Sequence, residues 1–141
     1  MSESTVWLRV EAAGQDLFLP TSAVLEVLPL PMVEPLPGGP RGIAGVVLYG
    51  GSFLPVLAWA DLPACATPLL PPTLLVVLRR FGLPVVRVEG MVSLDEEAWE
   101  PEPELLARGW SGGRVALQHG WGRKVDPERL VGVLRELRCE A

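Results

Sequence analysis

The chain alternates between short apolar stretches and turns that are rich in glycine and proline. Apolar and polar residues alternate over residues 6–12, in VWLRVEA, and the segment DLFLP after the turn AGQ completes a predicted hairpin. The apolar run TLLVVLRR, the turn FG and the segment LPVVRVEGMVSL predict a second hairpin. One more strand pair is predicted around His119 and Gly120.

The longest uncharged run comprises 19 residues, 42–60, between Arg41 and Asp61. This length is close to the roughly 20 apolar residues of a membrane-spanning helix. However, the pair Gly50-Gly51 readily adopts the positive φ angles of a tight turn. We therefore predict two strands, 43–49 and 53–59, joined as a hairpin.

The C-terminal segment DPERLVGVLRELR carries the clearest helix signal. Asp126 is a suitable N-cap, and Pro127 suits the first helical position. Four apolar residues recur with helical spacing and predict one buried stripe: Leu130, Val133, Leu134 and Leu137.

The composition favours one mainly β domain over residues 1–141, because 15 glycines and 15 prolines interrupt long helices. Two halves, 5–62 and 73–125, resemble a loosely repeated β unit. The net charge of −5 argues against nucleic acid as a partner. The N-terminus lacks the pattern of a secretory signal, so we expect a cytoplasmic protein without direct membrane insertion.

Two charge blocks of opposite sign follow each other along the chain. Residues 89–104 contain seven acidic and no basic residues, whereas 108–138 contain seven basic and three acidic ones. This pattern predicts a solvated loop facing a solvated helix or, alternatively, an acidic patch that faces a partner.

The sequence offers little chemistry for catalysis or for cofactor binding. Cys65 and Cys139 lack the spacing of a disulfide framework or a zinc site, and we expect reduced thiols. His119 is the only histidine, and a small enzyme would have to use His119 and Asp126 acting on Ser111. No nucleotide-binding, zinc-peptidase or calcium motif is present, so we expect no cofactor and no metal.

The five tryptophans allow either core packing or a binding role. Trp7 and Trp59 lie in predicted strands and are expected in the core. Trp99, Trp110 and Trp121 lie in glycine-rich or acidic contexts, where exposed aromatic residues could anchor a partner protein. A tryptophan-lined module for a small ligand is the remaining alternative.

The order of segments resembles the CheW-like family, the coupling proteins that join chemoreceptors to their histidine kinase. The resemblance spans roughly residues 15–134. A V-x-E-V element corresponds to Val24, Glu26 and Val27. The family's G-x-x-x-x-R-G-x-x-x-P-V-x-D-L element is largely matched by Gly45, Gly51, Pro55, Val56 and Leu62. Weaker later matches are Val88-Glu89-Gly90-Met91 and Val125, Asp126 and Leu130.

The resemblance implies two small five-stranded, SH3-like β-barrels that pack together, with the amphipathic helix at the C-terminus. It also implies a non-enzymatic adaptor between a chemoreceptor-type sensor and a CheA-like histidine kinase. The family's N-L-R-G element is replaced by Leu48-Tyr49-Gly50-Gly51, so the arginine expected to contact a receptor is missing. The expected partner-binding residues are Val24, Glu26, Leu48, Tyr49 and Gly50.

Overall fold

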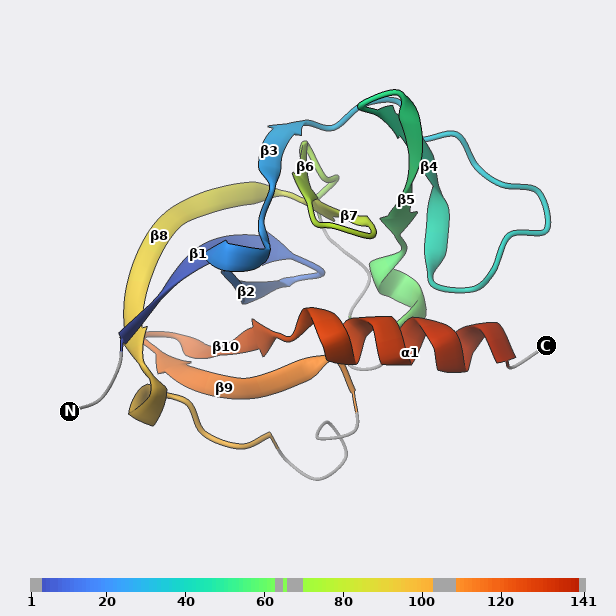
Figure 1. Ribbon diagram of the computed structural model, residues 1–141. Coiled ribbons are helices and arrows are strands. Elements are labelled where there is room, and N and C mark those ends of the chain that lie inside the picture. Colours follow the sequence, from blue (N-terminus) through green and yellow to red (C-terminus); the bar gives the residue numbers. More distant parts are fainter. Residues whose placement is uncertain (1–3, 63–64, 66–69, 103–108, 140–141) are drawn as a thin grey trace.

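The computed structural model describes residues 4–62, 65, 70–102 and 109–139 (Figure 1). The elements in chain order are β1 (Ser4–Ala12), β2 (Gln15–Pro20), η1 (Thr21–Ala23), β3 (Glu26–Pro29), β4 (Ile43–Tyr49), β5 (Ser52–Leu57), η2 (Trp59–Asp61), β6 (Leu74–Val77), β7 (Gly82–Val85), β8 (Arg87–Asp95), η3 (Glu96–Ala98), β9 (Ser111–Leu117), β10 (Gly120–Val125) and α1 (Pro127–Cys139). The strands form two five-stranded sheets: sheet A has the order β8-β1-β2-β10-β9, and sheet B has the order β3-β6-β7-β5-β4. The predicted mainly β class with a C-terminal helix is confirmed.

Each sheet takes its strands from both halves of the chain. Sheet A combines the hairpin β1–β2 with β8, β9 and β10, and sheet B combines the hairpin β6–β7 with β3, β4 and β5. The pairing is the same in both, since β2 runs parallel to β10 and β7 runs parallel to β5. The two halves that resemble a loose repeat thus contain equivalent strands. The first hairpin of each half belongs to the sheet that is otherwise built from the other half.

The two sheets also share an isolated backbone bridge at one edge strand. After β3 the chain returns to β4, where Glu34 and Val46 exchange two backbone hydrogen bonds of 2.9 Å. After β8 it returns to β9 in the same way, through Glu100 and Arg114, with bonds of 2.7 and 2.8 Å. These bridges cover part of an edge strand that would otherwise present unpaired backbone groups.

A glycine precedes each bridge because the returning chain passes too close for a side chain. A Cβ atom on Gly45 would overlap the carbonyl oxygen of Glu34. A Cβ atom on Gly113 would lie 3.0 Å from the carbonyl oxygen of Glu100, and this residue also has a φ of 152°. Within the described residues no strand ladder joins β3 to β4 or β8 to β9, so the predicted closure into barrels is not confirmed.

The core has three parts that follow from this architecture. The largest cluster lies between the sheets and includes Leu8, Val10, Leu17 and Leu19 of sheet A, Val76, Leu83 and Val85 of sheet B, and Leu130 and Val133 of α1. A smaller cluster lies within each sheet: Trp7, Phe18 and Val115 in sheet A, and Val47, Leu54, Val56, Leu75 and Val77 in sheet B. Strands such as β6 are therefore buried on both faces, which explains their continuous apolar sequence.

The uncharged run 42–60 forms the hairpin β4–β5, as the sequence predicts, but the second strand ends at Leu57 and Trp59 begins η2. Gly50 and Gly51 have φ angles of 56° and 81° in a two-residue turn between Tyr49 and Ser52. Positive φ at both central residues is the geometry of a type I′ turn, which suits the twist of a hairpin. No helix in the described part of the chain is long and apolar enough to cross a bilayer.

The helix α1 also begins as predicted. Asp126 Oδ1 accepts hydrogen bonds from the backbone N–H groups of Glu128 (3.0 Å) and Arg129 (3.3 Å), which caps the first turn. The apolar stripe of the helix packs on the cluster between the sheets, as Leu130 and Val133 are buried there.

The region between β6 and β8 differs from the prediction in two ways. The turn lies at Arg79 and Arg80, closed by a hydrogen bond of 3.0 Å from Leu78 N–H to Phe81 O, and not at Phe81-Gly82. The segment predicted as one strand is divided at Val86, where β7 in sheet B ends and β8 in sheet A begins. The apolar pattern continues through this division because both strands contribute side chains to the same core.

Candidate partner-binding surface

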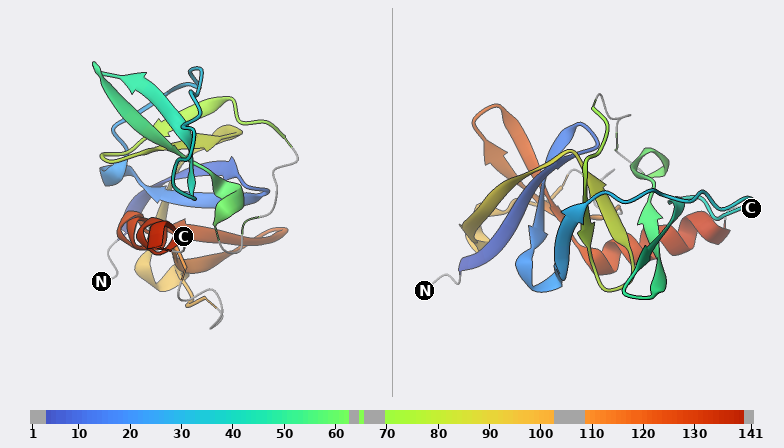
Figure 2. Two further views of the ribbon diagram at one scale, coloured as in Figure 1. Left: turned by 90° about the vertical axis from the view of Figure 1, so that its right-hand side faces the viewer. Right: turned by 90° about the horizontal axis from the view of Figure 1, so that it is seen from above.

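Two large apolar side chains are exposed on the hairpin β4–β5. Leu48 and Phe53 are directly opposite each other across the hairpin, and their side chains are 68% and 72% exposed. In Figure 2 this hairpin reaches out beyond the rest of sheet B. An exposed cross-strand apolar pair on a projecting hairpin is suited to burial against another protein.

A hydrogen bond holds the base of this surface. The hydroxyl of Tyr49 donates to Glu26 Oε2 at 2.6 Å, and so links β4 to β3, the two edge strands of sheet B. The hydrogen bond to the Glu26 carboxylate is the main cause that raises the pKa of Tyr49 above its ordinary value. The Tyr49 ring also packs on the core of sheet B, which fixes the strand beside Leu48.

The structure brings together four of the five residues expected to bind partners. Leu48, Tyr49 and Gly50 follow one another at the end of the hairpin, and Glu26 is tied to them through Tyr49. Val24 lies outside this group, because it is half-buried and packs against the large cluster between the sheets.

The backbone geometry of the turn favours glycine at residue 50, where the family has an arginine. A Cβ atom on Gly50 would meet no other atom within 4 Å, so space does not require glycine there. The φ of 56° does favour it, because a side chain in this left-handed region costs about 1 kcal/mol.

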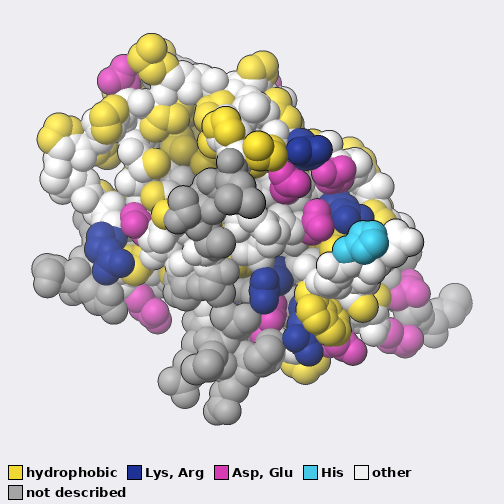
Figure 3. Space-filling view, turned by 180° about the vertical axis from the view of Figure 1, so that it is seen from behind, with side chains coloured by type: hydrophobic (Ala, Val, Ile, Leu, Met, Phe, Trp, Pro, Cys, Tyr) yellow, Lys and Arg dark blue, Asp and Glu magenta, His cyan; other side chains and the backbone are white. Residues whose placement is uncertain are grey.

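Phe53 is the part of this surface that the sequence analysis missed. The register of the predicted hairpin could have revealed it. A two-residue turn at Gly50-Gly51 pairs Tyr49 with Ser52 and therefore Leu48 with Phe53. More widely, hydrophobic side chains gather on the back of the molecule over the half that contains sheet B (Figure 3).

The residues of the alternative enzyme are not brought together. Ser111 and Asp126 lie at one end of the hairpin β9–β10, and His119 lies in the turn at the other end. A strand of this length separates them by roughly 20 Å. The Ser111 hydroxyl is buried and donates to Glu102 at 2.6 Å, and Asp126 caps α1. Ser111, Asp126 and His119 therefore do not form a catalytic site.

The tryptophans are distributed over separate parts of the structure. Trp7 and Trp59 are buried, as predicted, but Trp110 is also buried, and its expected role as an exposed anchor is wrong. Trp7 packs edge-on against Trp99 at 5.1 Å, and Trp59 against Trp110 at 6.1 Å. The exposed member is Trp121, on which the guanidinium group of Arg114 stacks at 3.9 Å.

The opposite charge blocks pair with each other, although not as loop and helix. The paired carboxylates lie after β8, in η3 and the segment that follows it, and the cations that meet them belong to the hairpin β9–β10. Among the described residues three ion pairs connect the two blocks: Glu96 with Lys124 (3.8 Å), Glu100 with Arg114 (3.9 Å) and Glu102 with Arg123 (3.2 Å). These three carboxylates are therefore paired with cations of the same chain.

The Glu102 pair is part of a buried network that the sequence analysis did not find. The Glu102 side chain is 1% exposed and accepts the hydrogen bond of Ser111. Arg123 also donates to Gln15 Oε1 at 2.6 Å, which ties the start of β2 to β10. A glutamate inside an acidic run gives no sequence signal of burial, because its partners are distant along the chain.

The one cysteine with a described side chain is a free thiol. Burial raises the pKa of Cys65 to about 11, against smaller opposing effects of Trp110 and Arg123. Cys139 has no described side chain. In the described part of the chain, no group of three histidine, cysteine or acidic residues is arranged to hold a metal ion.

Comparison with known proteins agrees with the fold. No protein of curated function matches the sequence. The scaffolding protein TtCheW from Thermoanaerobacter tengcongensis has a similar structure, with a TM-score of 0.75 and 16% sequence identity over 89% of this chain and 86% of that one. At this identity the likeness concerns the fold alone. A family model, the CheW-like domain, matches residues 7–133, which is most of the chain. The chain therefore belongs to the CheW-like domain family.

Proposed function

We propose that this chain is a non-enzymatic scaffold that couples a chemoreceptor-type sensor to a CheA-like histidine kinase, in chemotaxis or a related motility pathway. Membership of the CheW-like domain family supports this role. We further propose that residues 1–141 act as one unit with two barrel-like halves, and that it works in the cytoplasm.

The observation that carries the proposal is the exposed pair Leu48 and Phe53 on a rigid hairpin. Burying two large apolar side chains on a partner is favourable by about 1.5–3 kcal/mol for each. The hairpin is held in place by its pairing with β7 and by the Tyr49 to Glu26 hydrogen bond, so little conformational entropy is lost on binding. In this account the surface of Leu48, Tyr49, Gly50 and Phe53 contacts the kinase.

Glu26 and Val24 are proposed to serve the receptor side, on the strength of the family resemblance. The hydrogen bond of Glu26 to Tyr49 connects the two surfaces within one sheet. Gly50 lacks the charge and the donors of the family's arginine, so in this proposal receptor contact falls to Val24 and Glu26, and the hairpin serves the kinase.

Binding of the purified chain to the regulatory domain of a CheA-like kinase tests the proposal. In a calorimetric titration, Leu48→Asp and Phe53→Asp should each weaken binding at least about tenfold. Met32→Asp is the matched control, since Met32 is 82% exposed on the loop before β4. Equal affinities for all variants would exclude this hairpin as the kinase contact.

A further inference from the structure

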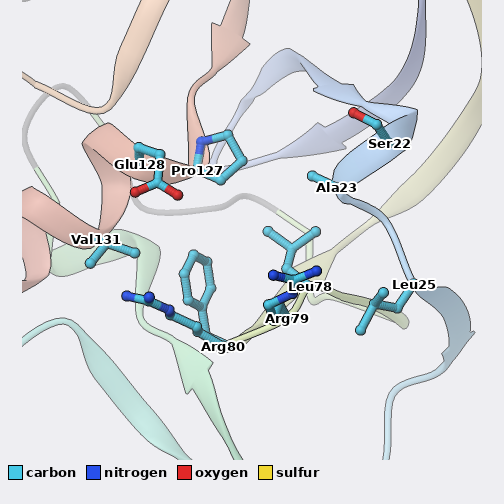
Figure 4. A pocket seen from close by; sticks show the side chains of 10 residues that line it. Ser22, Ala23, Leu25, Leu78, Arg79, Arg80, Pro127, Glu128 and Val131 are labelled. Atoms are coloured by element: carbon cyan, nitrogen blue, oxygen red, sulfur yellow. The ribbon is translucent and has the colours of Figure 1, made fainter.

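Two adjoining cavities run along α1 on a different part of the surface. The first, of about 220 Å³, lies between η1, the turn after β6 and the start of α1 (Figure 4). The second, of about 300 Å³, lies between the loop before β4, Pro55 of β5 and the middle of α1. Arg80, Phe81 and Val131 line both cavities, so the two adjoin along α1 and are treated together as one groove. We call it the α1 groove.

The floor of the α1 groove is apolar. Phe81 is buried in the centre, and Ile43, Val131 and Leu134 are half-buried along its length. Leu25 and Leu36 line its two cavities and are 59% and 45% exposed. Side chains of this size would lose unfavourable contact with water if a second apolar surface covered them.

The rim of the groove carries three arginines, Arg79, Arg80 and Arg135. Arg79, Arg80 and Arg135 form no ion pair with any residue that the structure describes, although the chain as a whole is acidic with a net charge of −5. Most other described cations do have a carboxylate partner: Arg9, Arg87, Arg114, Arg123, Lys124 and Arg129.

Among the described residues that line the two cavities, Glu128 is the one carboxylate. Glu128 stands on the helix side of the first cavity, and Arg79 and Arg80 stand on the side of the β6–β7 turn (Figure 4). The groove therefore has a net positive rim around an apolar floor. Guanidinium groups bind carboxylates with paired, charge-assisted hydrogen bonds.

We propose that the α1 groove binds a segment of a partner protein in which apolar side chains are flanked by glutamate or aspartate. The apolar floor requires apolar side chains from the occupant, and the three arginines require carboxylates. A nucleic acid would satisfy the arginines but would leave the floor uncovered, and the net charge of the chain would repel its phosphates. The groove shares no lining residue with the Leu48 and Phe53 pair, so the two surfaces are independent.

Selection from a random 12-residue peptide library on the full chain tests this proposal. Enriched peptides should combine leucine, isoleucine or phenylalanine with acidic residues. Their affinity, measured by fluorescence anisotropy, should fall at least about tenfold in Arg80→Glu and in Leu36→Asp. Arg87→Glu is the matched control, because it makes the same charge change on β8 outside the groove.

The outcomes separate the possible occupants. Retention of peptide binding in Leu48→Asp would support an independent site, provided that circular dichroism shows all variants folded. Enrichment of neutral or basic peptides would overturn the proposal. So would peptide binding that ignores Arg80→Glu, or a single-stranded DNA oligonucleotide that binds through Arg80 while acidic peptides do not.

Discussion

The phenol of Tyr49 donates a 2.6 Å hydrogen bond to the carboxylate of Glu26, and these two residues lie on the opposite edge strands of sheet B. The bond thus draws together edges that no strand ladder joins among the described residues. It also connects the family's V-x-E-V element to the hairpin with the exposed apolar pair. One side-chain contact therefore couples the two proposed partner surfaces.

This contact can be measured directly because Tyr49 is the only tyrosine in the chain. A titration followed by phenolate absorbance should give a pKa above the ordinary value of about 10, since Glu26 favours the protonated phenol. Because the pKa is raised in the folded state, the stabilising contribution is complete below the unfolded pKa. It is lost as the pH rises through the folded pKa.

The matched variant is Glu26→Gln, which keeps the size of the side chain and removes its charge. The pKa of Tyr49 should then fall toward its ordinary value. Glu97→Gln, an exposed carboxylate in η3, should leave it unchanged. A wild-type pKa at or below the ordinary value would contradict the contact.

Two glycine-to-alanine substitutions should have opposite effects on stability, one at a sheet edge and one in α1. Gly45→Ala should lower the free energy of unfolding by about 3 kcal/mol, because its Cβ atom overlaps the Glu34 backbone. Gly132→Ala in α1 should raise it by about 0.5–1 kcal/mol, because a Cβ atom there meets nothing within 4 Å.

Urea unfolding followed by tryptophan fluorescence gives both values. The pair is informative because each variant adds the same methyl group. A Gly45→Ala protein as stable as the wild type would show that the segment at Glu34 does not pass this close to β4.

Removal of the buried carboxylate should be costly. Glu102→Ala should lower the free energy of unfolding by roughly 3 kcal/mol, because it removes the carboxylate that pairs with the largely buried Arg123. Glu97→Ala is the exposed control and should change it by less than about 0.5 kcal/mol. Equal stabilities in a urea titration would argue against the buried network.

The raised pKa of Cys65 predicts that its thiol reacts slowly with alkylating reagents. In a Cys139→Ser background, iodoacetamide should label Cys65 at least about tenfold more slowly in the folded protein than in urea, because the thiolate is the reactive form. Labelling should accelerate as the pH rises toward about 11. Rapid labelling of the folded protein at neutral pH would contradict the burial of this side chain.

Local signals in the sequence were sufficient for several elements. The paired glycines at residues 50 and 51 indicate a hairpin because few other residues favour two successive positive φ angles. Asp126, Pro127 and the stripe that begins at Leu130 define α1, since caps and helical spacing act within one or two turns. Most strands were found for the same reason.

Features that depend on distant parts of the chain were not predictable in this way. The break between β7 and β8 at Val86 cannot be detected from the local sequence, because the apolar pattern continues from one sheet into the other. The partners of Glu102 and the burial of Trp110 depend on how the strands are exchanged between the halves. The exposure of Phe53 could have been inferred from hairpin register, but the α1 groove required the packed helix.

The most direct test of the scaffold is whether one molecule of this chain holds two partners together. Sedimentation velocity can be measured for the chain mixed with a CheA-like kinase regulatory domain and a chemoreceptor signalling fragment. We expect a species that contains all three proteins, and Leu48→Asp should leave only the complex of this chain with the receptor fragment. Mutually exclusive binding of the two partners, or no binding to either, would contradict it.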